Sequence, residues 1–478
     1  MSLCRAVTAA QLFRAPVAML AARGACRRAS ARWIVARCGL HDVVVDALGV
    51  TSRLKRGGCD THHPPYDHRH RHNHARRSFA AHSAAVDTHT MTTPLSQEED
   101  QTSFPSEDPF GLVKTELGAI SARMRTAVTS DIPALKTAAE YFFRSGSEGK
   151  RVRPTVLLLM ASALGEKNTG RPAAGDETNG VTQGVTSGVT QENDHQPDHA
   201  PAHETPSSVR RKQQRLAEVT ELIHVASLLH DDVIDGSATR RGLRALNLEV
   251  GNKLAILAGD FLLARSSVTL ASLKNVEVIE LLSRVLEHLV TGEVMQMTAD
   301  GDSLKSWDHY KKKTYLKTAS LIANSSKAVA ILGGHGEATA ELAYDYGKHL
   351  GLAFQYTDDV LDFTGSGSIL GKPTLGDLRE GIATAPVLFA SEEFPGLTPL
   401  VARRFKNQGD VEQAAFWVRA SAGVDKTKAL ARRHALLASQ AVDAMPRVSG
   451  GDEQEQRKQA QCRRALKELA RVAVERIK

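Results

Sequence analysis

Cysteine is scarce in the part of the sequence that could build a globular core. The chain has 478 residues and 5 cysteines, and four of the five lie near its N-terminus (Cys4, Cys26, Cys38 and Cys59). Beyond them only Cys462 remains, so a disulfide framework cannot form and a reducing compartment is expected. The composition is otherwise that of a globular protein, with 42% hydrophobic and 24% charged residues.

Long apolar runs and strand-like alternation are also missing. The run 156–164 is too short to span a bilayer and indicates a buried helix, so we expect no transmembrane segment. Apolar residues instead recur three and four positions apart, which predicts an all-α body. Besides one helix that ends near residue 235, the expected helices are 113–128, 132–144, 156–164, 253–273, 276–297, 308–332, 338–362, 379–391, 411–420, 426–445 and 452–478.

Acidic residues are absent from residues 1–41, which contain seven arginines spaced among apolar residues (Arg5, Arg14, Arg23, Arg27, Arg28, Arg32 and Arg37). This pattern is typical of a mitochondrial transit peptide; a plastid or microbody signal and a merely disordered basic tail are the alternatives. Residues 1–90 hold 14 Lys and Arg against 5 Asp and Glu, and the remainder holds 47 against 49. The net charge of +7 therefore belongs to the leader, which argues against nucleic-acid binding by the folded body.

Two segments depart from globular sequence. The histidine-rich tract 62–89 lacks the carboxylate or cysteine pattern of a metal site, which favours a disordered pre-sequence. The repeats GVTQ, GVTS and GVTQ lie within a low-complexity stretch at 166–214, which predicts a disordered surface insertion. We therefore expect a targeting leader with a histidine-rich segment at 1–108, and one helical domain at 109–478 that the insertion interrupts.

Three carboxylates stand at the end of the helix in LIHVASLLHDDVIDGSATRRG (222–242). Asp231 and Asp235 lie one turn apart on the same face, with Asp232 beside them. Carboxylates this close repel one another at a helix C-terminus, so the cluster favours bound Mg²⁺, which shares its ligands between carboxylates and substrate phosphates. Arg240 and Arg241 follow in a short loop and fit a metal-chelated polyphosphate. An isolated DDxxD of this kind would more simply be a solvated helix end.

A second DDxxD (Asp358, Asp359 and Asp362) ends the apolar-faced helix in GLAFQYTDDVLDFTG (351–365). Two such clusters that face each other across one cavity would hold several metal ions. The pair resembles the trans-type polyprenyl diphosphate synthases, and the resemblance covers about residues 113–446, apart from the insertion. It is carried further by GKRVRP (149–154), ELIHVASLLHDDVID (221–235), LAGDFLLA (257–264), GEVMQM (292–297), KTASLI (317–322) and GKPTLGDLREGIATAP (371–386).

The resemblance is greatest to long-chain members, such as solanesyl and hexaprenyl diphosphate synthases. It implies an orthogonal helical bundle around a deep central cavity. It further implies a Mg²⁺-dependent, sequential head-to-tail condensation of isopentenyl diphosphate onto an allylic diphosphate, which supplies the ubiquinone side chain; Mn²⁺ is the alternative ion. A homodimer is expected, with a heteromer as the alternative. The lipophilic product implies proximity to a membrane.

The resemblance also assigns the site residues. The metal ligands are Asp231, Asp232, Asp235, Asp358, Asp359 and Asp362; of these, Asp231, Asp235 and Asp358 act with Lys317 in catalysis. The residues that bind the allylic diphosphate are Arg240, Lys317, Thr318, Gln355 and Lys372. Those that bind isopentenyl diphosphate are Lys150, Arg153, His224 and Arg241. Taken singly, Lys150 and Arg153 could belong to a surface run and His224 could be a core histidine.

Small residues precede the first aspartate on the same helix. Ala226 and Ser227 lie five and four positions before Asp231, so Ala226 is about 7.5 Å below it along the helix axis. Short-chain members of the family carry aromatic rings near this level, so we expect the product to grow past it and to be long. The alternative is that these residues are small because another helix packs against them.

Other functions remain open at this point. A shorter-chain geranylgeranyl or farnesyl diphosphate synthase would keep both aspartate motifs. A non-catalytic subunit of a heteromeric synthase would be expected to lack acidic residues, and none is missing. A terpene cyclase carries an Asn/Ser/Glu-type second motif, and a simple divalent-ion binder needs neither GKRVRP nor Gln355 nor Lys372.

Overall fold

The computed structural model describes residues 108–141, 149–165, 206–240, 242–365, 374–447 and 452–475. All of them belong to one compact unit, Gln101–Lys478. The predicted leader, apart from its last residue, and residues 166–205 of the predicted insertion lie outside the described residues. The proposed division at residues 108 and 109 therefore stays a prediction.

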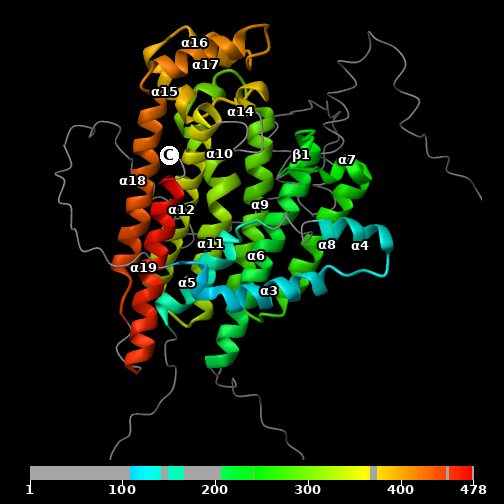
Figure 1. Cartoon of the computed structure of the whole chain (residues 1–478), viewed down its shortest axis with the longest axis vertical. Coiled ribbons are helices and arrows are strands. Elements are labelled where there is room, and N and C mark those ends of the chain that lie inside the picture. The colour runs from blue at the N-terminus through cyan, green and yellow to red at the C-terminus, as the bar shows by residue number, and fades with distance from the viewer. Residues whose placement is uncertain are drawn as a thin grey trace, which may run out of the picture. The chain divides into compact units, whose positions relative to one another are not determined.

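The described chain is a bundle of helices, as predicted (Figure 1). Its helices are α3 (Lys114–Ala127), α4 (Pro133–Glu140), α5 (Val152–Leu164), α6 (Pro206–Ile234), α7 (Leu246–Val250), α8 (Asn252–Ala271), α9 (Val276–Thr298), α10 (Trp307–Thr314), α11 (Ser320–Leu332), α12 (Glu337–Thr364), α14 (Gly376–Arg379), α15 (Ala385–Glu393), α16 (Leu397–Ala402), α17 (Asp410–Ala420), α18 (Gly423–Ala444) and α19 (Glu453–Glu475). Short 3₁₀ turns lie at Gly111–Val113 and Ser303–Lys305, and a π-helical turn at Tyr315–Ala319. Strands β1 (Thr239–Arg240) and β2 (Leu243–Arg244) form a small antiparallel hairpin that sequence analysis missed.

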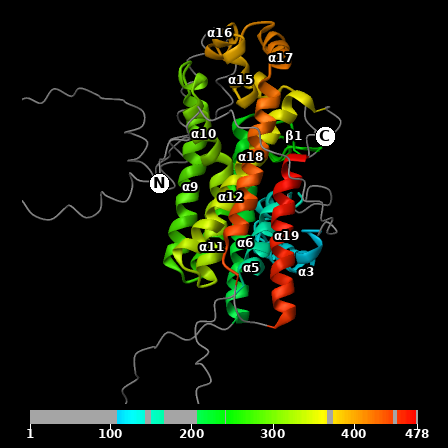
Figure 2. The same ribbon diagram turned by 90° about the vertical axis from the view of Figure 1, so that its left-hand side faces the viewer.

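Helix α12 is the central helix of the bundle, and it packs against α11 on one side and α18 on the other (Figure 2). Two glycines on α12 allow the close approach of α11. A Cβ on Gly347 would lie 2.6 Å from the carbonyl oxygen of Ile322, and one on Gly351 would lie 2.7 Å from Cα of Ala319. Any larger residue would push the two helices apart, so these glycines fix where α12 meets the π-helical turn.

Apolar side chains form two buried clusters. The larger one joins α3, α5, α6, α8, α9, α11, α12, α18 and α19, and includes the fully buried run Val156–Met160 of α5. The smaller one lies at the C-terminal end of α12 and contains Tyr310, Tyr356 and Phe363 together with α15, α16 and α17. The end of α12, where the second DDxxD lies, is thus supported by its own core.

Several predicted boundaries were wrong. The predicted helix 308–332 is divided by the π-helical turn, and the predicted helix 379–391 begins only at Ala385, because Gly381 adopts a φ of 80° before it. Helix α6 begins at Pro206, so the last part of the predicted insertion 166–214 is helical. Its first turns are tied to α3 by Arg210, which donates two hydrogen bonds to Glu116 at 2.8 and 2.7 Å.

Helix α8 qualifies the expectation that the chain has no transmembrane segment. Among the described residues it is the one helix long and apolar enough to cross a membrane, with a mean hydropathy of 1.5. Core helices of globular proteins pass the same test, and α8 packs against α4, α6 and α7 within the bundle. Its outer face nevertheless exposes apolar residues, among them Leu257 and Val268.

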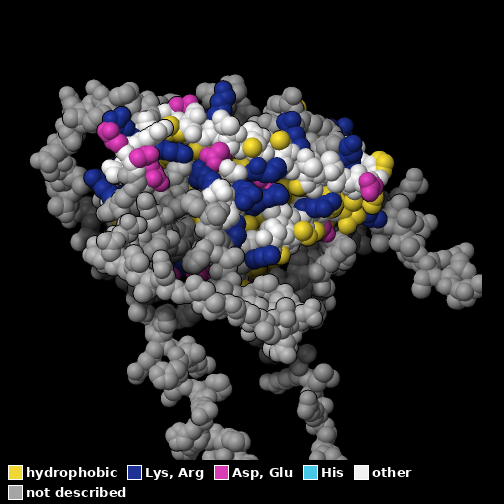
Figure 3. Space-filling model, turned by 90° about the horizontal axis from the view of Figure 1, so that it is seen from below, with side chains coloured by type: hydrophobic (Ala, Val, Ile, Leu, Met, Phe, Trp, Pro, Cys, Tyr) yellow, Lys and Arg dark blue, Asp and Glu magenta, His cyan; other side chains and the backbone are white. Residues whose placement is uncertain are grey.

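The surface at the end of the bundle where α19 begins carries many basic side chains interspersed with apolar and acidic ones (Figure 3). Exposed residues of α6 and α19, such as Arg211 and Lys458, contribute basic groups to the surface of these helices. Basic and acidic side chains are therefore distributed unevenly over the helical domain. Its aspartate motifs lie at the C-terminal ends of α6 and α12.

A pair of histidines lies in the interface between α12 and α18. His349 Nδ1 and His434 Nδ1 are 2.8 Å apart, and the ring of His434 also packs on Tyr356 with centroids 5.3 Å apart. Burial lowers the pKa of His349 to about 4, and burial together with His349 lowers that of His434 to about 3. Both imidazoles are therefore neutral in the folded protein at physiological pH.

This pair should make the protein less stable in mild acid. Because the pKa of both histidines is lowered on folding, protons bind preferentially to the unfolded chain once the pH falls below about 6.5. The free energy of unfolding should then fall, by up to about 1.4 kcal/mol per pH unit for each histidine, until the folded pKa is reached. Urea unfolding followed by circular dichroism at pH 7.5 and 5 measures the loss. The double variant His349→Phe, His434→Phe keeps two rings and should lose less stability over this range; an equal loss would contradict the assignment.

Candidate active site

The first aspartate motif divides into one buried and two more accessible carboxylates. Asp232 is 1% exposed, and Arg240 on β1 donates to it through Nε, at 3.0 and 3.2 Å from the two carboxylate oxygens, and through Nη2. Asn247 Nδ2 also donates to the backbone oxygen of Asp232 at 3.2 Å. Asp232 thus anchors the hairpin to the end of α6 and has its oxygens committed to Arg240, whereas Asp235 is exposed.

Asp231 lies in a crowded set of charges that sequence analysis only partly identified. Burial raises the pKa of Asp231 to about 7; Lys317 opposes this shift, and Glu293 and Asp235 add to it. Glu293 forms an ion pair with Lys317 and is itself 9% exposed. Burial lowers the pKa of Lys317, but Asp231 and Glu293 outweigh this effect and raise it overall. Glu293 belongs to GEVMQM, a motif noted in the sequence without a role for its glutamate.

The second motif also has one member that is fully committed to the protein. Asp359 is 0% exposed and accepts hydrogen bonds from the Tyr310 hydroxyl, from Gln355 Nε2 at 2.9 Å and from the Ala385 backbone N–H at 3.3 Å. Asp358, by contrast, is exposed. The structure therefore places Asp359 as a hub that joins α10, α12 and α15.

The third aspartate of this motif holds the loop that follows α12. Asp362 accepts hydrogen bonds from the backbone N–H groups of Gly376 at 2.9 Å and Asp377 at 3.3 Å. Leu375, just before them, adopts a left-handed φ of 63°, a strained conformation of the kind often found at functional sites. Burial, Asp359 and Asp362 raise the pKa of Asp377 to about 8, so a further crowded carboxylate lies here that sequence analysis had not assigned.

One π-helical turn connects the two motifs. It presents Lys317 toward the first motif and Thr318 toward the second, where Thr318 Oγ1 donates to Gln355 Oε1 at 2.8 Å. Single π-turns within helices occur frequently at functional sites. The turn is held between two glycines, because a Cβ on Gly292 would lie 3.0 Å from the Lys317 backbone nitrogen and Gly351 lies against Ala319.

The structure tests the other predicted contacts only in part. Lys150 is exposed and Arg153 and His224 are half-buried, so all three remain candidates for isopentenyl diphosphate binding. Arg151 between the first two has a left-handed φ of 50°, which turns the chain sharply just before α5. Two further predicted residues, Arg241 and Lys372, lie outside the described residues.

The predicted chain-length residues sit within the bundle. Ala226 is 0% exposed and belongs to the larger apolar cluster. Ser227 is half-buried, and its hydroxyl donates to the His224 backbone oxygen at 2.8 Å. A side chain larger than alanine at position 226 would therefore meet packed neighbours.

The donor set fits hard divalent cations. Burial and neighbouring carboxylates raise the pKa of Asp231 and of Asp377, so their ionised forms are unfavourable without a cation. Carboxylate oxygens are the preferred ligands of Mg²⁺. Across the residues that the structure describes, no three His, Cys, Asp or Glu side chains are already gathered as a complete metal site. The ligand set would have to be completed by substrate oxygens and water, as is usual for Mg²⁺.

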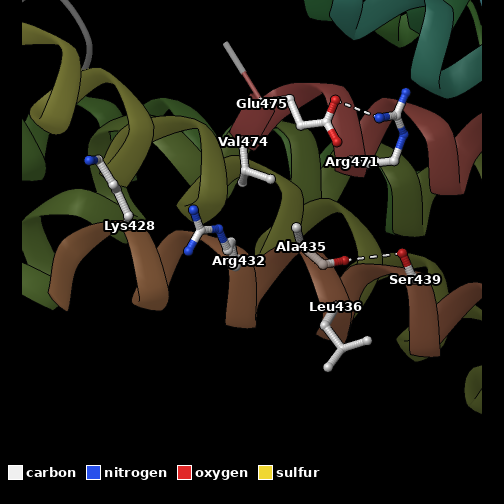
Figure 4. Close-up of a pocket in the computed structure, with 8 residues that line it drawn as sticks. All are labelled: Lys428, Arg432, Ala435, Leu436, Ser439, Arg471, Val474 and Glu475. Carbon is white, nitrogen blue, oxygen red and sulfur yellow. Dashed lines mark hydrogen bonds and ion pairs between the residues drawn. The ribbon is translucent and has the colours of Figure 1, made fainter. Parts of the chain in front are cut away.

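A hollow of about 560 Å³ lies elsewhere, between α18 and α19 (Figure 4). Lys428 and Arg432 line it, but Arg471 at its edge is neutralised by Glu468 and Glu475. None of the aspartates of the two motifs lines this hollow. It is therefore separate from the candidate active site.

An all-α bundle in which two aspartate motifs flank basic side chains fits the class of enzymes predicted from the sequence. Comparison with known proteins makes this specific. The Polyprenyl synthetase family model matches residues 132–417. The chain belongs to the polyprenyl synthetase family.

Relatives and a solved structure agree with this assignment. The chain is 50% identical over 352 residues to solanesyl-diphosphate synthase 1, mitochondrial, of Oryza sativa subsp. japonica, covering 74% of this chain and 75% of that protein. It is 45% identical over 354 residues to the probable hexaprenyl pyrophosphate synthase, mitochondrial, of Neurospora crassa, covering 72% and 78%. A polyprenyl synthase from Caulobacter crescentus, complexed with calcium and isoprenyl diphosphate, has 30% identity and a TM-score of 0.62, and the match covers 78% of this chain and 100% of that one.

These findings confirm the predicted family, the all-α fold and a prenyltransferase of the long-chain type. They also confirm the predicted mitochondrial localisation. The roles of individual site residues stay predictions.

Proposed function

We propose that this chain catalyses the Mg²⁺-dependent, sequential condensation of isopentenyl diphosphate onto an allylic diphosphate to give a long polyprenyl diphosphate for the ubiquinone side chain. The observation that supports it best is the π-helical turn. Its Lys317 forms an ion pair with Glu293 and interacts electrostatically with Asp231, and its Thr318 reaches Asp359 through Gln355. One turn of helix thus couples both aspartate motifs to one substrate site.

The contacts favour a division of labour within each motif. Asp235 and Asp358 are the exposed members of the two motifs, and Asp231 lies beside the charges of Lys317 and Glu293, so these three are the proposed metal ligands and catalytic residues. Asp232 and Asp359 instead position Arg240 and the Thr318–Gln355 pair. Asp362 holds the loop that begins at Thr374. The six predicted ligands therefore contribute to the site in two different ways.

The chemistry is ionisation of the allylic diphosphate followed by attack of the isopentenyl double bond. Mg²⁺, when held by Asp231, Asp235 and Asp358, would neutralise the departing diphosphate oxygens and lower the barrier to carbocation formation. Lys317 and Arg240 donate to the same diphosphate, and Lys150, Arg153 and His224 bind the second diphosphate without metal. Arg241 and Lys372 complete these two sets by family resemblance.

The proposed assembly is a homodimer, with a heteromer as the alternative. Exposed apolar residues on α8 and at the start of α9 support a protein contact there, since Val268 is 69% and Val276 81% exposed. The lipophilic product implies that the enzyme works near a membrane. Mn²⁺ is the alternative metal.

The test is to incubate the full chain with isopentenyl and farnesyl diphosphates and Mg²⁺, and to separate the dephosphorylated products by chromatography. We expect consumption of isopentenyl diphosphate and a single long polyprenol. A product that stops at geranylgeranyl length would identify the shorter-chain alternative. No product from the chain alone, with activity restored by a second subunit, would identify a non-catalytic or heteromeric role.

A further inference from the structure

Lys313 is a cation beside the second aspartate motif that the proposed mechanism does not use. It lies on α10 one helical turn before Lys317 and is half-buried. Its Nζ lies 5.4 Å from the centroid of the Tyr310 ring, and the Tyr310 hydroxyl donates to Asp359. Cations are attracted to aromatic faces at this distance. Lys313 is thus held against the residue that anchors Asp359.

The charges that act on Lys313 come mainly from the second motif and its loop. Burial lowers its pKa, and the carboxylates of Asp359 and Asp377 oppose that effect. Lys313 in turn opposes the rise in the pKa of Asp377 that burial, Asp359 and Asp362 produce. Among the described residues no carboxylate closes an ion pair with Lys313. The positive charge of Lys313 therefore acts on Asp359 and Asp377 together and is not neutralised by one ion-pair partner.

Lys313 borders a small hollow. Together with Tyr310 it lines a volume of about 20 Å³, and Gly381, Ile382 and Ala383 are among the other residues that line it. This volume corresponds to about one water molecule. Because these three residues lie between α14 and α15, Lys313 lies beside the segment that leads from α14 into α15. The lysines of α10 and the π-turn are thus distributed, with Lys317 at the first motif and Lys313 at the second.

We propose that Lys313 is a positioning residue for the second aspartate motif. Its fixed positive charge partly neutralises the motif's carboxylates, so that divalent metal binds there well only together with a diphosphate. A fixed positive charge lowers the affinity of a carboxylate cluster for a free divalent cation. A diphosphate brings anionic oxygens that offset this charge, so metal binds well once the diphosphate is present. The inference rests on the proposed function. It adds a binding order, in which the diphosphate and the metal ion of the second motif bind together.

The test measures metal binding without turnover. Mn²⁺ is titrated into the full-length protein, and free Mn²⁺ is followed by electron paramagnetic resonance, with and without inorganic pyrophosphate. Lys313→Gln and Lys313→Met should lower the Mn²⁺ dissociation constant of the pyrophosphate-free protein about fivefold to tenfold. Lys313→Arg, which keeps the charge, and Lys312→Gln, which removes an exposed neighbouring lysine, should stay within about twofold of the wild type. With pyrophosphate present, the neutral variants should differ little from the wild type.

Wild-type Mn²⁺ affinity in both neutral variants would overturn the proposal. It would also be overturned if both variants failed to fold by circular dichroism while Lys313→Arg folded, since the ammonium would then serve the fold. The proposed function has its own readout in the product assay on the wild-type chain. Absence of polyprenyl product in that assay would contradict the proposed function. The difference in Mn²⁺ affinity between the Lys313 variants and the wild type would still be tested as a binding property.

Discussion

Replacing Asp231 or Asp358 by alanine should reduce turnover at least about 1000-fold, equivalent to about 4 kcal/mol of transition-state stabilisation. Each substitution removes a proposed ligand carboxylate from the metal site. Neither should unfold the bundle, because burial already makes the ionised form of Asp231 unfavourable and Asp358 is exposed. The product assay and circular dichroism on the same samples measure both effects.

The matched control is Asp345→Ala, which removes a half-buried aspartate from the same helix as Asp358. Its activity should equal that of the wild type, since Asp345 pairs with Lys348 and lies about 20 Å before Asp358 along α12. Activity of both site variants within about tenfold of the wild type, about 1.4 kcal/mol, would show that these carboxylates do not hold the catalytic metal.

Replacing Ala226 by phenylalanine should shorten the product to farnesyl or geranylgeranyl diphosphate. The ring would lie about 7.5 Å below Asp231 along the helix, on the predicted path of the growing chain. The metal site is untouched, so the first condensation should continue. Chromatography of the dephosphorylated products gives the chain length directly.

Because Ala226 is completely buried, the Ala226→Phe substitution should also lower stability, which must be measured together with the product length. Overpacking a core position destabilises a protein by about 1–3 kcal/mol, so the melting temperature of Ala226→Phe should fall. Ser227→Phe is the companion variant, because Ser227 is half-buried and leaves more room for a ring. If both variants fold and still make the full-length product at the wild-type rate, neither residue borders the path of the chain.

Much of the site could be predicted from the sequence because its key residues are close together in the chain. The spacing of Asp231 and Asp235 placed them on one helix face, and the second DDxxD showed the same pattern on α12. The partners of Asp232 and Asp359 could not be predicted in this way. Arg240 reaches Asp232 only because the short hairpin folds back, and Tyr310 meets Asp359 across 49 residues of chain.

The roles of Glu293 and Asp377 could not be predicted for the same physical reason. Glu293 and Asp377 belong to recognised motifs, but their roles depend on packing between distant helices and loops. The π-helical turn could not be predicted either, since the sequence from Asp308 to Leu332 keeps a continuous helical pattern. What closes the turn is the approach of Gly292 and Gly351 from two other helices, which local periodicity does not report.

That turn also sets the phase between the two halves of its helix. Each residue of an α-helix advances the chain by about 100°, and a π-turn holds one residue more within its hydrogen-bonded ring. Because the turn already absorbs this extra residue, deleting one residue from 315–319 would leave α10 and α11 as a single regular helix with Ala323 still facing α12. The deletion would instead remove the widened turn that carries Lys317 and Thr318, so it should cost the site far more than it costs the fold.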